Sequence, residues 1–394
     1  MNGTIYMPVG EVCSSISDTY REKKNMVTLI NTSDVLEGRV LNHERVPNSN
    51  LKGQFKKTFQ RDDILYSEIR PQNRRFAYVD FSPIDYIAST KLMVIRAKKD
   101  VVSPKYLYYF LKNSSTVAEL QLLAETRSGT FPQITFSEVA NLTIPVPSLA
   151  VQEVIVQTMQ CLEDKITCNE QINDNLEQQA QAIYHEHFET VSPNDLPSDW
   201  RIVTLGEVAT ISNKSFNPLK EPEILLEHYS IPAFDEARFP VFELSTSIKS
   251  NKFIIDASCF MISKLNPTTK RVWKPYCLTG NAVCSTEFIV YKAKDQSITD
   301  FLYSVIDSGS FSDFMCSHVT GSTGSRQRTT PSDTLSYELI LPSEDELAEF
   351  QSLVSPMYAQ MRINAIENDK LKRLRDSLLP KLMSGEIDVS AVQL

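Results

Sequence analysis

Residues 148–188, with the sequence SLAVQEVIVQTMQCLEDKITCNEQINDNLEQQAQAIYHEHF, decide the fold of this chain and contain neither Gly nor Pro. Apolar or small residues recur there at alternating steps of four and three, interrupted by two Asn residues. The positions are Ile155, Met159, Leu162, Ile166, Asn169, Asn173, Leu176, Ala180 and Ile183. This spacing is typical of a helix that packs on another helix through a heptad seam. About 40 residues at ~1.5 Å each predict a rod of roughly 60 Å, which would separate the two halves of the chain.

The same seam returns 195 residues later. Its positions are Phe350, Val354, Met357, Met361, Asn364, Asn368, Leu371, Arg375 and Leu378, so both polar positions are again Asn. One stripe alone is more often the buried face of a core helix. Two matched stripes, each closing one half of the chain, favour two long helices that pair with each other.

Other landmarks repeat at offsets of 195 to 197, which indicates that the whole chain is a duplicated unit. They are Gly10-Glu-Val12 with Gly206-Glu-Val208, Ser67-Glu-Ile-Arg-Pro71 with Ser263-Lys-Leu-Asn-Pro267, Ser89-Thr90 with Ser285-Thr286, Tyr106-Leu-Tyr108 with Phe301-Leu-Tyr303, the loop around Gly129 with that around Gly324, and Ile144-Pro145 with Leu341-Pro342. We therefore predict an α+β protein with two similar mixed α/β domains, residues 1–147 and 191–342. Two long spacer helices, residues 148–190 and 343–386, follow them.

Local patterns in the first copy predict its elements. Segments 63–69 and 87–95 are rich in β-branched and aromatic residues and are predicted strands. Ser103 is placed to cap a helix that has Pro104 at its first position.

Composition describes an ordinary globular protein. The chain has 394 residues, 42% of them apolar and 23% charged, which suggests two or three domains. No signal peptide is visible and no apolar segment approaches ~18 residues, so we expect no membrane span. The seven Cys form no C-x-x-C pair, which favours reduced thiols in the cytoplasm. His185 and His187 are two residues apart on a helix and face different ways, so no metal site is expected.

Each copy carries a local basic segment, although the net charge of the chain is −9. Residues 51–75 hold seven bases against three acids, and residues 246–275 hold six bases against one. A single charge run is usually a solvated surface, but two matched runs favour phosphate contacts with nucleic acid. Arg, Lys and Gln can also read base edges through paired hydrogen bonds. The residues of these segments that we expect to contact DNA are Lys56, Lys57, Arg70, Arg74, Arg75, Lys264, Lys270, Arg271 and Lys274.

The repeated Gly loops add further candidates. The second, Gly321-Ser-Thr-Gly-Ser-Arg-Gln-Arg328, could cradle a phosphate through backbone N–H groups, or be a plain surface turn. It lacks the Gly-Lys-Ser/Thr ending of a nucleotide-binding P-loop, which excludes that class of NTPase. From the two loops we add Thr130, Gln133, Ser325, Arg326, Gln327 and Arg328 to the expected DNA contacts.

No catalytic motif stands out. The chain shows no G-x-G-x-x-G after a strand, no Asn/Asp-Pro-Pro-aromatic tetrapeptide and no G-x-S-x-G elbow. We therefore expect a non-catalytic, bivalent binder that needs no cofactor of its own. Two other classes stay open: a nuclease or methyltransferase with an unrecognised site, and a two-lobed scaffold that does not bind DNA.

Several motifs resemble those of the specificity subunit of type I restriction–modification systems, over essentially the full length of the chain. They are Leu196-Pro-Ser-Asp-Trp200, Leu205-Gly-Glu-Val208, Gly321-Ser-Thr-Gly-Ser-Arg-Gln-Arg328, Leu374-Arg-Asp-Ser-Leu-Leu-Pro-Lys-Leu-Met-Ser-Gly-Glu-Ile387, Gly129-Thr-Phe-Pro-Gln-Ile134 and Leu142-Thr-Ile-Pro-Val-Pro147. The two loops differ, because Thr130-Phe131-Pro132 stands where the second copy has Ser325-Arg326-Gln327.

The resemblance implies two target-recognition domains joined by two long antiparallel helices. Each domain would read one half of a split double-stranded DNA target. Two methyltransferase subunits would clasp the helices, and a full restriction complex would add motor-nuclease subunits. S-adenosylmethionine and ATP would then belong to those partners.

Overall fold

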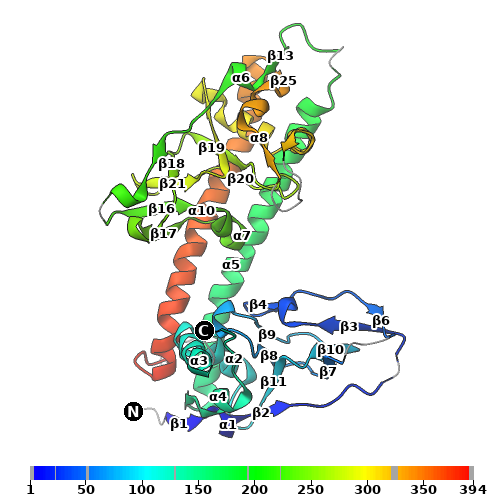
Figure 1. The fold of residues 1–394 in the computed structure, drawn as a ribbon, viewed down its shortest axis with the longest axis vertical. Helices are drawn as coiled ribbons and strands as arrows, with labels where there is room; N and C mark the ends of the chain where they lie inside the picture. Colours follow the sequence, from blue (N-terminus) through cyan, green and yellow to red (C-terminus); the bar gives the residue numbers. More distant parts are fainter. Residues whose placement is uncertain are drawn as a thin grey trace. The chain divides into compact units, whose positions relative to one another are not determined.

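The computed structural model describes residues 4–22, 24–49, 53–127, 130–192, 195–221, 223–320 and 327–389. It divides into two compact units. The first unit comprises Met1–Lys165 and Leu371–Leu394, and the second comprises Ile166–Lys370. Two long helices, α5 (Leu149–Tyr184) and α10 (Glu344–Ser384), each contribute residues to both units (Figure 1).

The first unit contains two four-stranded sheets, a two-stranded ribbon and a short hairpin. The sheets have the orders β2-β11-β8-β9 and β6-β3-β10-β7, and β1 pairs with β12. Its strands are β1 (Ile5–Pro8), β2 (Cys13–Ile16), β3 (Met26–Ile30), β4 (Val35–Leu36), β5 (Arg39–Val40), β6 (Val46–Pro47), β7 (Phe55–Lys57), β8 (Ile64–Ser67), β9 (Phe76–Tyr78), β10 (Tyr86–Ser89), β11 (Leu92–Ala97) and β12 (Thr143–Val146). Its shorter helices are α1 (Val9–Val12), η1 (Thr32–Asp34), η2 (Pro71–Asn73), α2 (Pro104–Lys112), α3 (Ser114–Arg127) and α4 (Phe136–Asn141).

The second unit repeats this plan with additions. The sheets have the orders β14-β22-β19-β20 and β15-β18-β21-β16-β17, and β13 pairs with β25. Its strands are β13 (Arg201–Thr204), β14 (Ala209–Ile211), β15 (Ser215–Phe216), β16 (Leu225–Tyr229), β17 (Val241–Leu244), β18 (Lys252–Ile254), β19 (Cys259–Ser263), β20 (Val272–Trp273), β21 (Ala282–Ser285), β22 (Phe288–Ala293), β23 (Val319–Thr320), β24 (Arg328–Thr329) and β25 (Glu338–Leu341). Its helices are η3 (His185–Glu189), α6 (Leu205–Val208), η4 (Pro218–Lys220), α7 (Ile231–Ala237), η5 (Ser245–Ser247), η6 (Gln296–Ile298), α8 (Thr299–Ile306), α9 (Gly309–Ser317) and η8 (Pro331–Ser336).

The pairing directions confirm the predicted duplication and the mixed α/β class. In each unit one sheet contains a single parallel pair, β3 with β10 or β16 with β21, and β10 and β21 each pair antiparallel with a further strand, β7 or β18. The other four-stranded sheet is antiparallel throughout in both units. The second sheet differs by an added strand, β15, which pairs with β18, and the second unit also has helix α7 between β16 and β17.

The repeated Gly-Glu-Val landmark is explained by close packing. A Cβ added to Gly10 would lie 3.0 Å from the Cβ of Ala140 on α4, and one added to Gly206 would lie 3.2 Å from Leu335 on η8. Such contacts are tighter than most real Cβ contacts, so a side chain at either position would require its neighbour to move by a few tenths of an ångström.

One predicted strand is two strands. Segment 87–95 turns at Thr90 and Lys91, so that β10 lies in one sheet and β11 in the other. The turn forms because the hydroxyl of Ser89 accepts a hydrogen bond from the Lys91 amide, at 3.3 Å. Ser285 accepts from the Glu287 amide at 3.2 Å in the same way, which explains the repeated Ser-Thr landmark.

The helix that begins at Pro104 has Ser103 at its N-cap, as predicted, but the Ser103 side chain makes no capping hydrogen bond. Its backbone N–H instead donates to Gln152 Oε1 of α5, at 2.8 Å. Tyr106, Leu107 and Tyr109 of this helix are fully buried in the first core. The equivalent helix α8 buries Phe301 and Leu302 in the second.

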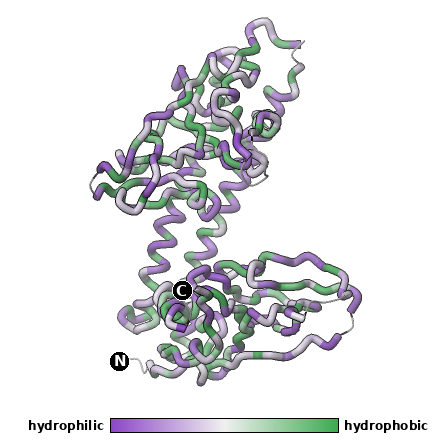
Figure 2. Tube along the Cα trace, in the orientation of Figure 1, coloured by the Kyte–Doolittle hydropathy of each residue, from purple (hydrophilic) through white to green (hydrophobic). Residues whose placement is uncertain are grey.

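The long helices run antiparallel, as predicted. Within the second unit Asn169 of α5 bonds to Asn368 of α10, and Asn173 bonds to Asn364, so residue numbers rise on one helix as they fall on the other. Both helices are mainly hydrophilic, with hydrophobic residues at intervals (Figure 2). This pattern fits a narrow seam rather than a fully buried helix.

Candidate nucleic-acid interface

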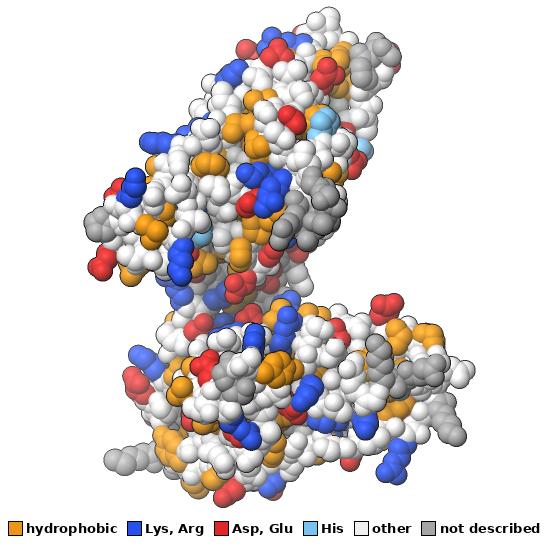
Figure 3. Space-filling model, viewed as in Figure 1, with side chains coloured by type: hydrophobic (Ala, Val, Ile, Leu, Met, Phe, Trp, Pro, Cys, Tyr) orange, Lys and Arg blue, Asp and Glu red, His pale blue; other side chains and the backbone are white. Residues whose placement is uncertain are grey.

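Basic side chains do not gather on one continuous surface in the view of Figure 3. On that face of both units, Lys and Arg side chains lie interspersed with Asp and Glu. The role of each predicted residue therefore depends on its local partners.

In the first unit, Lys57 and Arg75 bind the protein's own backbone. Lys57 Nζ donates to the carbonyl oxygens of Thr90 and Leu92, at 3.1 and 2.8 Å, and burial lowers the pKa of this amine. Arg75 Nη1 donates to the carbonyl of Ser33 at 3.0 Å. Lys56, the residue before Lys57 on β7, is exposed. Two of these three predicted residues thus hold strands and turns together.

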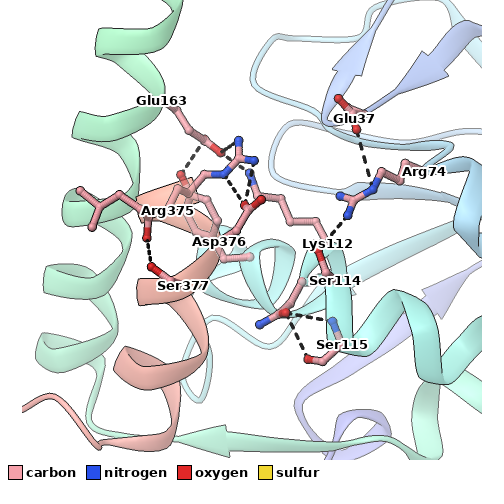
Figure 4. Close-up of polar contacts among 12 residues, drawn as sticks. Glu37, Arg74, Lys112, Ser114, Ser115, Glu163, Arg375, Asp376 and Ser377 are labelled. Atoms are coloured by element: carbon pink, nitrogen blue, oxygen red, sulfur yellow. Dashed lines mark hydrogen bonds and ion pairs between the residues drawn. The ribbon is translucent and has the colours of Figure 1, made fainter. Parts of the chain in front are cut away.

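Arg74 has left-handed backbone angles, with φ of 52°, at the end of η2. Its Nη2 donates to the hydroxyl of Ser114, at the start of α3, at 2.8 Å, and its Nε lies 3.8 Å from Glu37 Oε1 (Figure 4). The guanidinium therefore bridges two parts of the first unit. A DNA contact by Arg74 would have to share the group with these partners.

Lys112 lies beside Arg74 at the edge of a small cavity of about 50 Å³. Its ammonium group forms an ion pair with Glu163 of α5 (Figure 4). The same group lies over the rings of Tyr108 and Tyr109, 4.8 and 4.5 Å from their centroids. Arg375 of α10 lies 3.8 Å from the same carboxylate. Both long helices are thereby tied to the end of α2 through Glu163.

Arg70 and Gln133, by contrast, lie at one place, which we call the first junction. It consists of segments 67–70, 89–91 and 132–134. The Glu68 amide donates to the Lys91 carbonyl at 3.0 Å, the Ile134 amide to the Glu68 carbonyl at 2.8 Å, and the Arg70 amide to the Pro132 carbonyl at 3.1 Å. Arg70 is exposed there, with φ of 44°, and Thr130 is exposed three residues before Gln133.

The side chains of the first junction form a small polar group. Lys91 Nζ lies 3.4 Å from Glu68 Oε2 and 3.3 Å from Gln133 Oε1. The Lys91 side chain is 49% exposed, whereas Glu68 is 21% exposed. A cation, an amide and a carboxylate therefore meet at the surface of the first unit.

In the second unit, three predicted bases form ion pairs. Arg271 binds both carboxylate oxygens of Asp235, at 2.5 and 2.9 Å, and Lys274 pairs with Asp300. Lys270 Nζ lies 2.7 Å from Asp307 Oδ1 and donates to the Asp307 carbonyl.

The pair between Lys270 and Asp307 is asymmetric, because only its acid is buried. Asp307 is 1% exposed, whereas the Lys270 side chain is 40% exposed. Burial raises the pKa of Asp307 to about 6, against the opposing effect of Lys270. Removing the lysine would leave a buried acid without its counter-charge.

Lys264, Gln327 and Arg328 meet at the second junction, which consists of segments 263–266, 285–287 and 327–329. The Lys264 amide donates to the Glu287 carbonyl at 2.9 Å, the Thr329 amide to the Lys264 carbonyl at 3.2 Å, and the Asn266 amide to the Gln327 carbonyl at 2.9 Å. Arg328 donates through Nε and Nη2 to the two Glu287 oxygens, at 3.0 and 3.1 Å, and this bond raises the pKa of Arg328. The predicted Ser325 and Arg326 lie outside the described residues.

Sequence reasoning missed Glu68, Lys91 and Glu287. A signal was available, since Lys91 and Glu287 each stand one residue after a repeated Ser-Thr landmark, and Glu68 stands inside another. The prediction rests on charge counts within segments 51–75 and 246–275 and on the Gly loops, so it does not compare the charged residues that stand at matched positions of the two copies.

The predicted seam residues lie along α5 and α10 as follows. Ile155, Ile166, Asn169, Asn364 and Asn368 are buried, and Leu162, Asn173, Leu176, Ile183, Met357, Met361, Leu371 and Leu378 are partly buried. Asn169 Nδ2 donates to Asn368 Oδ1 and Asn364 Nδ2 to Asn173 Oδ1, both at 2.8 Å. The side chains of Asn173 and Asn368 also donate to carbonyls of the facing helix, at 3.2 Å.

Across the part of the chain that the structure describes, no cluster of three or more His, Cys, Asp and Glu residues could hold a metal ion. Within the same residues no helix is both long and apolar enough to cross a membrane.

Comparison with known proteins finds sequence matches that all name one kind of protein. Residues 6–178 match the model of the type I restriction modification DNA specificity domain. The chain is 29% identical to the type I restriction enzyme HindI specificity subunit of Haemophilus influenzae, covering 92% of this chain and 94% of that protein. It is 25% identical to the MjaIX specificity subunit of Methanocaldococcus jannaschii, covering 78% and 76%.

Solved structures share the fold. One, from a study of complex assembly and conformational transition of a type I restriction–modification system, has a TM-score of 0.51 at 19% identity and covers 98% of both chains. The type I S subunit of M. genitalium has a TM-score of 0.54 at 15% identity and covers 97% of this chain and 96% of its own. The sequence matches confirm the predicted resemblance of this chain to the specificity subunits of type I restriction–modification systems.

Proposed function

We propose that this chain is the DNA-recognition subunit of a type I restriction–modification complex and reads a two-part DNA target, one half-site per unit. The observation that carries the proposal is the repeat of one polar junction, with identical backbone hydrogen bonds, in both units. Two equivalent recognition surfaces on one chain suit a target with two halves, because linked binding events raise the effective concentration of the second.

The residues predicted to contact DNA differ in how well their surroundings suit that role. Arg70, Thr130, Gln133, Lys264, Gln327 and Arg328 belong to or adjoin the two junctions, and Lys56 is exposed, so we propose them as DNA contacts. Ser325 and Arg326 remain proposed contacts from their sequence alone. Lys57, Arg74, Arg75, Lys270, Arg271 and Lys274 have protein partners. Any DNA contact they make would exchange those partners for phosphate.

The division of labour follows from the same proposal. Residues 1–147 and 191–342 would be the recognition domains, and residues 148–190 and 343–386 the docking helices for two methyltransferase subunits. S-adenosylmethionine would bind those subunits, ATP would bind restriction subunits where present, and the complex would work in the cytoplasm. The chain itself would supply no catalytic group and no cofactor site.

A transfer assay tests this assignment. The purified chain, the methyltransferase encoded beside it, and both together are incubated with labelled S-adenosylmethionine and DNA. We expect methyl transfer only in the mixture, and no cleavage by the chain alone. Transfer by the chain alone would instead support the enzyme alternative. Duplex binding that does not fall steeply with salt would support the scaffold alternative.

A further inference from the structure

The two junctions have the same backbone hydrogen bonds, but an acid and a base exchange places between them. Each of the three backbone hydrogen bonds of the first junction has its counterpart in the second, and the β-bridge between Ile69 and Gln133 corresponds to that between Leu265 and Arg328. Ser67 and Ser263 also make the same bonds, since each hydroxyl accepts the amide two residues later. Side chains at matched positions therefore occupy equivalent places in the two units.

At two of these matched places an acid and a base are exchanged, and at the third the residue type differs. Glu68 corresponds to Lys264, Lys91 corresponds to Glu287, and Gln133 corresponds to Arg328. In the first junction a lysine holds the amide oxygen of Gln133, at 3.3 Å. In the second a carboxylate holds the guanidinium of Arg328 by two bonds. Each outward polar group is thus oriented by a partner of the complementary kind.

We propose that Gln133 and Arg328 are the base-reading residues of the two half-sites, and that Lys91 and Glu287 are their positioning residues. This inference rests on the proposed function. A Gln amide pairs with the N6 and N7 atoms of adenine, whereas Arg pairs with O6 and N7 of guanine. The first unit therefore reads an adenine at this place, and the second unit reads a guanine.

The different positioning residues, Glu287 and Lys91, suit the different side chains that they orient. Arg328 is 42% exposed on a flexible stem, and the Glu287 carboxylate fixes the plane of its guanidinium. The side-chain amide of Gln133 can adopt two orientations related by a flip of the amide. Lys91 selects the orientation in which Oε1 faces its ammonium group, because an ammonium group can only donate a hydrogen bond. A lysine at position 287 would repel Arg328, so the reader and its partner must change together.

The test maps methylated bases in genomic DNA when the full chain is co-expressed with its methyltransferase. Arg328→Gln and Arg328→Lys are compared with the unchanged chain. We expect the guanine at one position of one half-site to lose roughly 5- to 150-fold of its preference over other bases, while the other half-site stays the same. Gln133→Arg should do the reverse, weakening adenine preference in the other half-site only.

Two further variants separate reading from folding. Glu287→Gln should weaken preference at the same base as Arg328→Lys, whereas a purely structural role would lower methylation at all sites alike. Lys292→Gln removes a cation from another ion pair of the same unit, with Asp256, and should leave both half-sites unchanged. Should Arg328→Gln fail to accumulate, Arg328→Lys and Gln133→Arg carry the same test.

The outcomes distinguish this inference from the function on which it rests. Unchanged half-sites in every active variant, or an equal loss at all sites, would overturn the reading role while leaving the two-part target intact. An unchanged chain that directs no two-part methylation pattern would overturn the proposed function itself.

Discussion

Lys270 and Asp307 show how much a single residue's role depends on contacts far along the chain. From sequence, Lys270 is one of six bases in a segment with one acid, and the prediction was a DNA contact. In the fold it is the counter-charge of a carboxylate 37 residues later, in a core that only tertiary packing creates. A charge count along a segment contains no information about such a partner.

Because of this contact, we expect the main effect of Lys270→Ala to be a loss of stability rather than a direct loss of DNA binding. The substitution removes the ion-pair partner of the buried Asp307 carboxylate, which keeps a hydrogen bond from the Gln181 amide at 2.6 Å. Breaking a fully buried pair costs about 3–5 kcal/mol, and the loss here should be smaller because Lys270 is partly exposed. Adding Asp307→Asn should recover most of the loss, which melting curves of the single and double variants would measure. If Lys270→Ala melts like the unchanged chain yet binds DNA more weakly, the residue contacts DNA directly.

Asp307 also predicts a pH dependence. Its folded pKa of about 6 lies above its ordinary value of 3.8, mainly because of burial, with Lys270 and Arg238 opposing and Glu177 adding to the rise. Its favourable contribution is therefore complete below about pH 3.8 and is lost as pH rises through 6. Measured by urea unfolding, Asp307→Asn should gain stability relative to the unchanged chain between pH 4 and 6.5, by up to about 3 kcal/mol. A difference that does not vary with pH would contradict the assignment.

At the scale of elements, the heptad and the landmarks predicted most of the architecture. Both depend on short-range spacing, which is visible in sequence: Gly10 and Gly206 mark close approaches, and Ser89 and Ser285 mark turns. The sequence nevertheless predicts one strand across the turn at Ser89, because residues 87–95 include β-branched residues on both sides of it. The junctions join segments up to 66 residues apart, as in the bond from Ile134 to Glu68, and no local pattern reveals them.

The four Asn residues give the prediction that belongs to the helix pair. Asn368→Leu alone deprives the buried amide of Asn169 of one partner and should cost about 1–3 kcal/mol. Changing Asn169, Asn173, Asn364 and Asn368 together to Leu should raise the melting temperature, because a fully apolar seam has no polar group to satisfy. The same change should permit wrong registers or oligomers, which light scattering would detect. A homogeneous monomer with unchanged DNA specificity would contradict a role for the Asn residues in register.

At the scale of the whole molecule, we predict that the long helices set the gap between the half-sites. Inserting four residues beside Gln178 of α5 adds ~6 Å of helix and about 40° of rotation beyond a full turn. One base pair adds ~3.4 Å and roughly 35°. The added length corresponds to nearly two base pairs and the added rotation to about one. Each recognition domain must face its groove, so the rotation is the stricter condition. We therefore expect the gap to grow by one base pair and the half-sites to stay unchanged. The insertion is a stutter in the heptad and should cost some stability. An active variant that keeps the original gap would exclude α5 as the ruler.

The duplication of the chain is the central feature, and its most direct test is the methylation pattern that the unchanged protein directs. The chain is co-expressed with its methyltransferase in a host that lacks other such systems, and every methylated base in the genome is sequenced. We expect one target made of two different half-sites with a fixed gap of unspecified bases. A single uninterrupted target, or two identical half-sites, would contradict the conclusion that each unit reads its own sequence.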